Sequence, residues 1–407
     1  MRIVHLLDPE YCGDEGVLAC SRAITIPDIR HSVWIIGDSA ADRRVNALGI
    51  TTPDRVNTRR GWLGRADPLA CSRGVRNLAA ARFASDGMPD IICCWSVQGL
   101  ALARAAIGRR RPWRVGVLTR PPIGDLDAGP LRRTAEYGLH DATAVALSRS
   151  IADAFAGAAS VRRGGILLRD NIREIEPPAF PHGGTADWDR NAVRTRLGLE
   201  ESDVVLGLLA DPEGAGDAVR LIFNVGLCYT MGRRLVGLVP KHASNTRRAS
   251  RFVRAHGRRW GLCVADAPLT DIIAASDVCA VDATPHLHGA VTSSGPTAIS
   301  LAMAMGVPVV AMPRAVLRRN DEFPPPMPLA ASDDPNRLTI PTLRVLEDAG
   351  ARADLAAEQR AWCDRARARD DFRQTLGAVF RETANIPVMR PGLPRPTALA
   401  GTAGGAA

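Results

Sequence analysis

Apolar and polar positions alternate along the chain in a way that predicts strands and helices in regular succession. In the first half, short apolar runs predict strands at 2–7, 31–36, 90–94, 113–118, 143–147 and 165–168. Apolar residues at helical spacing predict helices between them, at 15–26, 72–85 and 97–107. Several strands are apolar throughout, which is typical of a parallel sheet covered by helices on both faces.

A proline- and glycine-rich stretch at 176–187 predicts a linker, after which the alternation starts again. Strands are predicted at 204–209, 235–239, 262–265, 278–281 and 307–312, and helices at 216–229, 246–256, 269–275 and 297–305. A helix-rich segment at 338–383 follows. We therefore predict an α/β protein of two doubly wound, Rossmann-like domains that face a cleft, at 1–175 and 188–385, with a disordered tail at 386–407.

Composition describes an ordinary globular protein. The 407 residues are 46% hydrophobic and 23% charged, which excludes a disordered chain and suffices for two cores. The sequence contains no run of about 18 apolar residues, so no membrane-spanning helix is expected. The start of the chain does not resemble a signal peptide. The nine cysteines are scattered without metal-type spacing. We expect a cytoplasmic protein with reduced thiols and no metal site.

The net charge of +9 is almost entirely arginine, because Lys241 is the single lysine. The arginines form no long block and aromatic residues are only 4%, so a nucleic-acid partner is not expected. Residues 1–170 hold 24 arginines against 17 acidic residues, so this half carries most of the excess. The excess is consistent with an anionic substrate or with a peripheral contact between the first half and an anionic membrane.

Five segments resemble motifs of the group 1 (family 4) glycosyltransferases, in the same order. GDEG at 13–16 resembles the glycine-rich loop after that family's first strand, and PDIICCWS at 89–96 resembles its PDVVHAHS segment. In the second half, RNAVRTRLGL at 190–199, DIIAASDV at 271–278 and GPTAISLAMAMGVPVVA at 295–311 resemble the R-x-x-x-R-x-x-L-G-L, ELLAAADV and FPNVLLEAMACGVPVVA segments. The resemblance implies the GT-B fold, with an acceptor domain followed by a donor domain.

The resemblance also implies a retaining transfer of a sugar from a nucleotide-sugar, which is a substrate and not a cofactor, to a carbohydrate or lipid-linked acceptor. In this family, the start of the helix at 297–305 directs backbone N–H groups at the donor diphosphate. The donor-binding residues then expected are Gly13, Gly16, Lys241, Ser294, Gly295, Pro296 and Thr297. Ordinary helix capping explains Ser294 and Pro296 equally well, and an exposed lysine is commonly only solvated.

Three residues are catalytic candidates. Arg120 follows a first-domain strand and is a candidate for contact with phosphate or acceptor. Asp282 opens a loop at 282–293 that is longer than the family's, and it is a candidate replacement base. Ser293 stands where the family has the first of two glutamates eight positions apart. Solvated loop residues or local ion pairs are the alternative interpretation.

The chain also departs from the family's pattern. The second glutamate position is Leu301, and the family's basic pair falls within DPEGAG at 211–216, which has no cation. The histidine positions of the first domain read CCWS at 93–96. A second hypothesis is therefore an inactive GT-B protein that serves as a partner or scaffold of a transferase. An epimerase on the same plan is a third, although no acid/base carboxylate pair is evident.

Overall fold

The fold is described from a computed structural model of the chain. The description covers all residues except 38–40, 42–44, 47, 52, 58–67, 109–111, 120–136, 140–141, 148–150, 153–154, 156–171, 177, 179, 181–188, 210–217, 242, 244, 256–260, 282, 286–290, 294–295, 312–327, 329–337 and 386–407.

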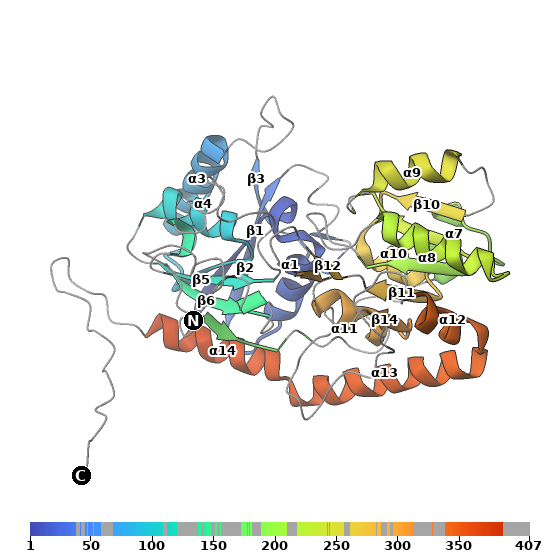
Figure 1. The fold of residues 1–407 in the computed structure, drawn as a ribbon. Coiled ribbons are helices and arrows are strands. Elements are labelled where there is room, and N and C mark those ends of the chain that lie inside the picture. Colours follow the sequence, from blue (N-terminus) through green and yellow to red (C-terminus); the bar gives the residue numbers. More distant parts are fainter. Residues whose placement is uncertain are drawn as a thin grey trace, which may run out of the picture.

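The first half forms a seven-stranded parallel sheet with strand order β3-β2-β1-β4-β5-β6-β7 (Figure 1). Its strands are β1 (Arg2–Leu7), β2 (Arg30–Gly37), β3 (Asp54–Asn57), β4 (Ile91–Cys94), β5 (Trp113–Leu118), β6 (Thr143–Ala146) and β7 (Ile172–Glu174). The helices α1 (Pro9–Ala23), α3 (Pro68–Asp86) and α4 (Val97–Ile107) lie between them in the sequence. β1 is central, with Leu6 opposite Trp34 on one side and Cys94 on the other.

The second half forms a five-stranded parallel sheet with strand order β10-β9-β8-β11-β14. Its strands are β8 (Val205–Leu208), β9 (Val236–Pro240), β10 (Gly261–Ala265), β11 (Val278–Val281) and β14 (Val309–Ala311). Its helices are α7 (Arg190–Arg196), α8 (Ala218–Thr230), α9 (Thr246–Ala255), α10 (Leu269–Ala275) and α11 (Pro296–Ala304). A short antiparallel hairpin, β12 (Ala283–Pro285) with β13 (Val291–Ser293), lies inside the segment expected to be a loop.

Three helices close the chain: α12 (Thr339–Glu347), α13 (Ala349–Arg369) and α14 (Asp371–Ala384). α13 packs on α11 and α12, whereas α14 packs on β4 and β5 of the first sheet. Figure 1 shows this pair passing from the second half of the molecule to the first. The expected range of 188–385 assigns α14 to the second domain, but Thr383 Oγ1 lies 3.2 Å from Thr143 Oγ1 at the start of β6.

Most of the central elements lie where the apolar pattern predicts them. β1, β5, β11, α4 and α10 have the expected bounds, and the neighbouring elements agree within a few residues, except that α1 begins at Pro9 and not at residue 15. β3 and β7 were not predicted, and both are edge strands with charged residues, so they lack a continuous apolar run. The strand expected at 165–168 lies outside the described residues.

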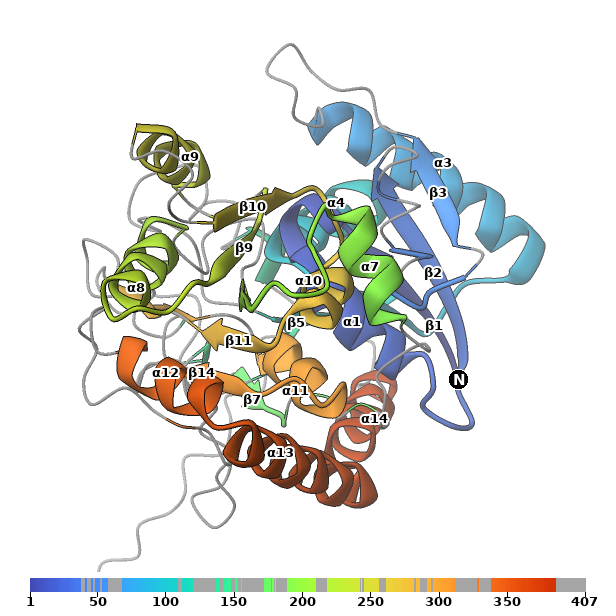
Figure 2. The ribbon, with the colours of Figure 1, turned by 90° about the vertical axis from the view of Figure 1, so that its right-hand side faces the viewer.

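The two halves are in direct contact. Buried apolar side chains from both sheets belong to one continuous cluster, and a smaller cluster lies around α7 and α10. α1 of the first half packs on α11 of the second, as the two views in Figures 1 and 2 show. Within the part of the chain that is described, no helix combines the length and the apolar character needed to cross a bilayer. The contact between α1 and α11 positions the site described next.

Candidate functional site

The site lies where the start of α1 meets the starts of α10 and α11. In a doubly wound protein, the loops after the carboxyl ends of the strands lead into helix N-termini, and ligands bind there. α1 follows β1 of the first sheet, and α10 follows β10 of the second. α11 follows β11 and the β12–β13 hairpin.

Gly13 divides α1 into a short first turn and a longer second segment. Pro9 begins the turn, and the Cys12 amide donates to the Asp8 carbonyl at 2.7 Å. Gly13 then has φ 63° and ψ −171°, a backbone conformation that a side chain would strain. The second segment starts at Asp14 and Glu15, so two carboxylates stand in the first turn of a helix, where the helix dipole favours negative charge.

The Glu15 carboxylate binds the N-terminus of α11 with both oxygens. Oε2 accepts from the Thr297 amide at 3.0 Å, and Oε1 accepts from the Ala298 amide at 2.8 Å. Pro296 opens the helix, and the amides after it have no partner within the helix. Glu15 is only 1% exposed and Thr297 is fully buried. The start of α11 is therefore an anion-binding position, and in this structure a carboxylate of the chain itself occupies it.

The neighbouring Asp14 makes the same kind of contact with a second helix. Its Oδ2 accepts from the amide of Leu269, the first residue of α10, at 3.1 Å. Asp14 is 2% exposed. Adjacent carboxylates from the first domain thus cap two helices of the second, and we call Asp14 and Glu15 the acidic latch.

Gly16 lets the latch lie close to the preceding turn. A Cβ at Gly16 would come within 2.6 Å of the Cys12 Cβ and 3.5 Å of the Trp95 carbonyl oxygen. Packing alone therefore accounts for the glycine at this position, as backbone conformation does for Gly13. Both glycines were expected to bind the donor, and that role remains a proposal.

Buried hydroxyls without partners lie at the same helix starts. Within the described residues, Thr297 Oγ1, Ser300 Oγ and Thr270 Oγ1 make no hydrogen bond, and all three side chains are fully buried. A buried hydroxyl without a partner costs about 1–3 kcal/mol. Thr297 thus retains a donor next to the amides that hold the carboxylate.

A series of hydrogen-bonded side chains connects β4 with β1 and β2 in the first sheet. Trp95, which follows β4, donates its indole N–H to His5 Nδ1 at 3.2 Å, and His5 Nε2 lies 2.8 Å from His31 Nδ1. His31 Nε2 lies 3.3 Å from the Ile26 carbonyl oxygen. This order of partners fits two neutral rings, each protonated on Nε2. Burial lowers the pKa of His5 well below its usual value, and the charge of His31 lowers it further.

The comparisons with known proteins concern the fold. No family model and no curated protein matches the sequence. Among solved structures, the chain is similar to HepE of Anabaena in complex with UDP and glucose, with 18% identity, a TM-score of 0.63, and 94% of this chain and 100% of that chain covered. Sucrose-phosphate synthase of Thermosynechococcus elongatus is similar at 14% identity and a TM-score of 0.56, with 94% and 98% covered. UDP-GlcNAc 2-epimerase of Neisseria meningitidis is similar at 9% identity and a TM-score of 0.50, with 94% and 100% covered.

The chain has the GT-B fold. The seven- and five-stranded parallel sheets and the coverage of entire chains agree on this architecture. The fold prediction is confirmed. Because a transferase and an epimerase share the same GT-B plan, the fold does not itself select the reaction.

Four of the expected donor residues lie at the acidic latch, since Gly13 and Gly16 flank it in the sequence and α11 brings Pro296 and Thr297 to it. Pro296 begins α11, and Thr297 contributes the amide bound by Glu15. Lys241 lies elsewhere, after β9, where its Nζ is 2.7 Å from Asp266 Oδ2 in an exposed ion pair. The Ser293 backbone pairs with Ala283 in the hairpin. Arg120, Asp282, Ser294 and Gly295 lie outside the described residues, as do 211–216.

The residues that depart from the family motif have structural roles in the fold. Leu301, at the second glutamate position, is fully buried in the middle of α11. Trp95 at a histidine position is fully buried, and Ser96 caps α4 by accepting from the Gly99 amide at 2.9 Å. No group of three possible metal ligands occurs among the residues that are described.

The latch itself was not predicted from the sequence. Asp14 and Glu15 were noted only as part of the glycine-rich loop, without a role. Two adjacent acids after a glycine, at the start of a helix that follows a buried strand, were the available signal. Their partners lie 255 and 282 residues away, and no local pattern identifies such contacts.

Proposed function

We propose that the protein is a glycosyltransferase that moves a sugar from a nucleotide-sugar to a carbohydrate or lipid-linked acceptor, with retention of configuration. The observation that carries this proposal is the bidentate contact between the Glu15 carboxylate and the Thr297 and Ala298 amides. The contact supports an anion-binding position at a domain contact within a fold that HepE, solved with UDP and glucose, shares.

Donor binding in this proposal requires the latch to open. A diphosphate would replace the Glu15 carboxylate on the amides of α11, because both ligands use the same N–H groups. The Thr297 hydroxyl, which has no partner among the described residues, would gain one. Opening would separate α1 from α11, so donor binding is coupled to movement between the domains.

The transfer itself breaks the bond between the anomeric carbon and a phosphate oxygen while the acceptor oxygen bonds to that carbon. Negative charge develops on the leaving diphosphate, and the α11 amides would stabilise it. With retention, a phosphate oxygen of the donor would take the acceptor proton. Arg120, Asp282 and Ser293 stay in this proposal as the residues that contact acceptor, phosphate or sugar.

A second candidate is a GT-B protein without activity that serves as a partner of a transferase. The latch also supports this function, because a buried carboxylate already satisfies the amides that a donor would need. Leu301 supports it as well, since a buried leucine offers no hydrogen bond to a nucleotide ribose.

Calorimetric titration with UDP-, GDP- and ADP-sugars, followed by an assay for sugar release or transfer, tests the proposal. A transferase binds at least one of these donors below millimolar concentration and releases its nucleotide when an acceptor, or water, is supplied. Binding without turnover across an acceptor panel favours the inactive partner. If neither the wild type nor Glu15→Gln, which frees the α11 amides, binds any of these donors, the proposed donor site is wrong.

A further inference from the structure

α8 is apolar on two faces, and only one of them is covered by its own domain. Leu221, Val225 and Cys228 are buried on the inner face. On the outer face, Phe223 is 45% exposed. Large apolar side chains that gather on an exposed surface mark a contact with a partner or a membrane.

The neighbouring helix α9 carries positive charge without any acid. Arg247, Arg251 and Arg254 are spaced by four and three residues and form one exposed stripe, and the exposed Arg248 lies beside it. Neither α8 nor α9 contains an acidic residue. No carboxylate in the described part of the chain pairs with these four arginines.

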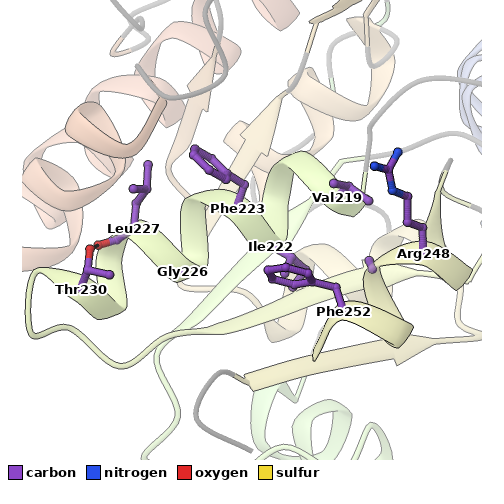
Figure 3. Close-up of a pocket in the computed structure, with 9 residues that line it drawn as sticks. Val219, Ile222, Phe223, Gly226, Leu227, Thr230, Arg248 and Phe252 are labelled. Carbon is purple, nitrogen blue, oxygen red and sulfur yellow. Dashed lines mark hydrogen bonds between the residues drawn. The ribbon is translucent and has the colours of Figure 1, made fainter. Parts of the chain in front are cut away.

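A groove of about 340 Å³ separates the two helices (Figure 3). Phe223 and Leu227 of α8 line it from one side and Phe252 of α9 from the other, with Arg248 at its edge. Phe252 is 41% exposed. Its position four residues after Arg248 places the aromatic ring and the guanidinium on the same face of α9.

Further exposed apolar side chains belong to elements next to this groove. Besides Phe223 and Phe252, Met231 after α8 is 62% exposed, Ile340 on α12 is 45% exposed, and Val264 on β10 is 38% exposed. α12 packs on α8 and β10 packs on α9. Figure 1 shows α8, α9 and α12 together at the end of the second domain that is remote from the first. We call this the α8–α9 face.

We propose that the α8–α9 face binds the surface of an anionic lipid bilayer, with the phenylalanines entering the headgroup region and the α9 arginines contacting lipid phosphates. An arginine-rich helix with aromatic residues on its flank is the arrangement that interfacial membrane helices use. The positive charge of the α9 arginines is complementary to an anionic surface. Membrane binding would also remove the exposed apolar side chains of this face from water. This contact is independent of the proposed donor site.

The proposal moves the expected membrane contact from the first domain to the second. The excess of arginine lies in residues 1–170, but acids accompany arginines there, as in the pairing of Arg82 with Asp54. On α9, four arginines share ten residues with no acid. Local charge density next to exposed apolar groups, and not net charge over half the chain, selects the α8–α9 face.

Co-sedimentation of the full-length protein with vesicles tests this inference. Vesicles of phosphatidylcholine alone are compared with vesicles of equal parts phosphatidylcholine and phosphatidylglycerol. The wild type is expected to bind the anionic vesicles and not the neutral ones. The double variant Arg247→Gln/Arg251→Gln is expected to lose roughly 30-fold in affinity, at about fivefold per arginine. Phe252→Ser is expected to lose about tenfold through lost apolar burial.

The matched control is Arg30→Gln/Arg73→Gln, which removes the same charge from exposed positions of the first domain. It is expected to bind the anionic vesicles like the wild type. All substituted residues are exposed, and thermal unfolding checks that each variant folds. Equal binding to neutral vesicles, no binding to anionic ones, an equal loss in the control, or unchanged binding of Phe252→Ser would each overturn the proposal.

Discussion

Glu15 and Thr297 join the two domains through a carboxylate–amide hydrogen bond of 3.0 Å between residues 282 positions apart. The bond is buried, and the same carboxylate also accepts from Ala298 at 2.8 Å. It places a negative charge of the first domain on the positive end of a helix of the second. The acidic latch therefore both closes the domain contact and occupies the position where an anionic ligand would bind.

Replacing Glu15 with glutamine is expected to lower the free energy of unfolding. Glutamine removes the charge at the start of α11 and replaces one of the two accepting oxygens with an NH2 group, which cannot accept from a backbone N–H. A loss of about 1–3 kcal/mol is expected in urea unfolding. Glu358→Gln, an exposed glutamate on α13, is the matched control and should change stability by less than about 0.5 kcal/mol. Equal stability of the two variants would show that the latch contributes nothing to folding.

Replacing Asp277 is expected to lower the stability of the second domain strongly. Burial would raise its pKa, but the Val205 amide, Arg190 and Arg194 outweigh burial and lower it below 3.8. Arg194 is 5% exposed and holds Asp277 Oδ2 at 2.8 Å. Asp277→Asn should cost about 3 kcal/mol at neutral pH, because it leaves the Arg194 charge buried without its partner.

The sign of this pH dependence follows from the lowered pKa. The contribution of Asp277 is present above the pKa of the unfolded chain and is lost as pH falls through the folded value. The difference between wild type and Asp277→Asn should therefore shrink below about pH 4. A difference that stays constant between pH 7 and acid conditions would contradict the ionic role.

The two histidines should make the protein less stable in mild acid. Burial lowers the pKa of both His5 and His31, although the Ile26 carbonyl partly opposes the shift of His31. Both rings are neutral in the folded state, so their contribution is present above the unfolded pKa of 6.5 and is lost as pH falls below it. Each such proton corresponds to at most about 1.4 kcal/mol per pH unit.

Urea unfolding at a series of pH values from neutral to mildly acidic checks this expectation. His31→Gln should flatten the decline, because the glutamine carbonyl can accept from His5 Nε2 without titrating. A variant with the same slope as the wild type would show that other groups cause the acid sensitivity.

Gly16→Ala is expected to destabilise the start of α1. The new Cβ would meet the Cys12 Cβ at 2.6 Å, which is closer than packed atoms approach, so the turn before Glu15 must shift. Overpacking of this kind costs about 1–3 kcal/mol. Gly377→Ala on α14 is the matched control, because its Cβ would have an ordinary 3.4 Å contact with Ile26. Thermal unfolding that moves equally in both variants would contradict a packing role for Gly16.

The apolar pattern predicted the central strands because burial on both faces makes such strands continuously apolar, as in Ile91–Cys94 and Val278–Val281. Edge strands are half-solvated, so Asp54–Asn57 carried no comparable signal. The position of α14 on the first sheet depends on contacts such as Thr383 with Thr143, which are distant in sequence. Local periodicity finds helices but does not assign them to a domain.

The candidate site was predicted in part. The start of α11 was expected to bind an anion, and that expectation rests on the general properties of helix N-termini. The identity of the anion in this structure was not predicted, because Glu15 reaches α11 only when the two domains pack together. Leu301 was noted in the sequence as a missing glutamate, and its complete burial in α11 accords with that observation.

The central claim is that the Glu15 carboxylate and a donor diphosphate compete for the same amides of α11. Calorimetric titration of wild type, Glu15→Gln and Asp14→Asn with UDP-glucose and its GDP and ADP counterparts measures this competition. Removing the Glu15 charge should tighten binding of the preferred donor by roughly tenfold. Asp14 caps α10 and not α11, so Asp14→Asn weakens the domain contact without freeing the α11 amides and should leave the affinity within about threefold of wild type. Unchanged or weaker binding by Glu15→Gln, or an equal gain in both variants, would contradict the claim.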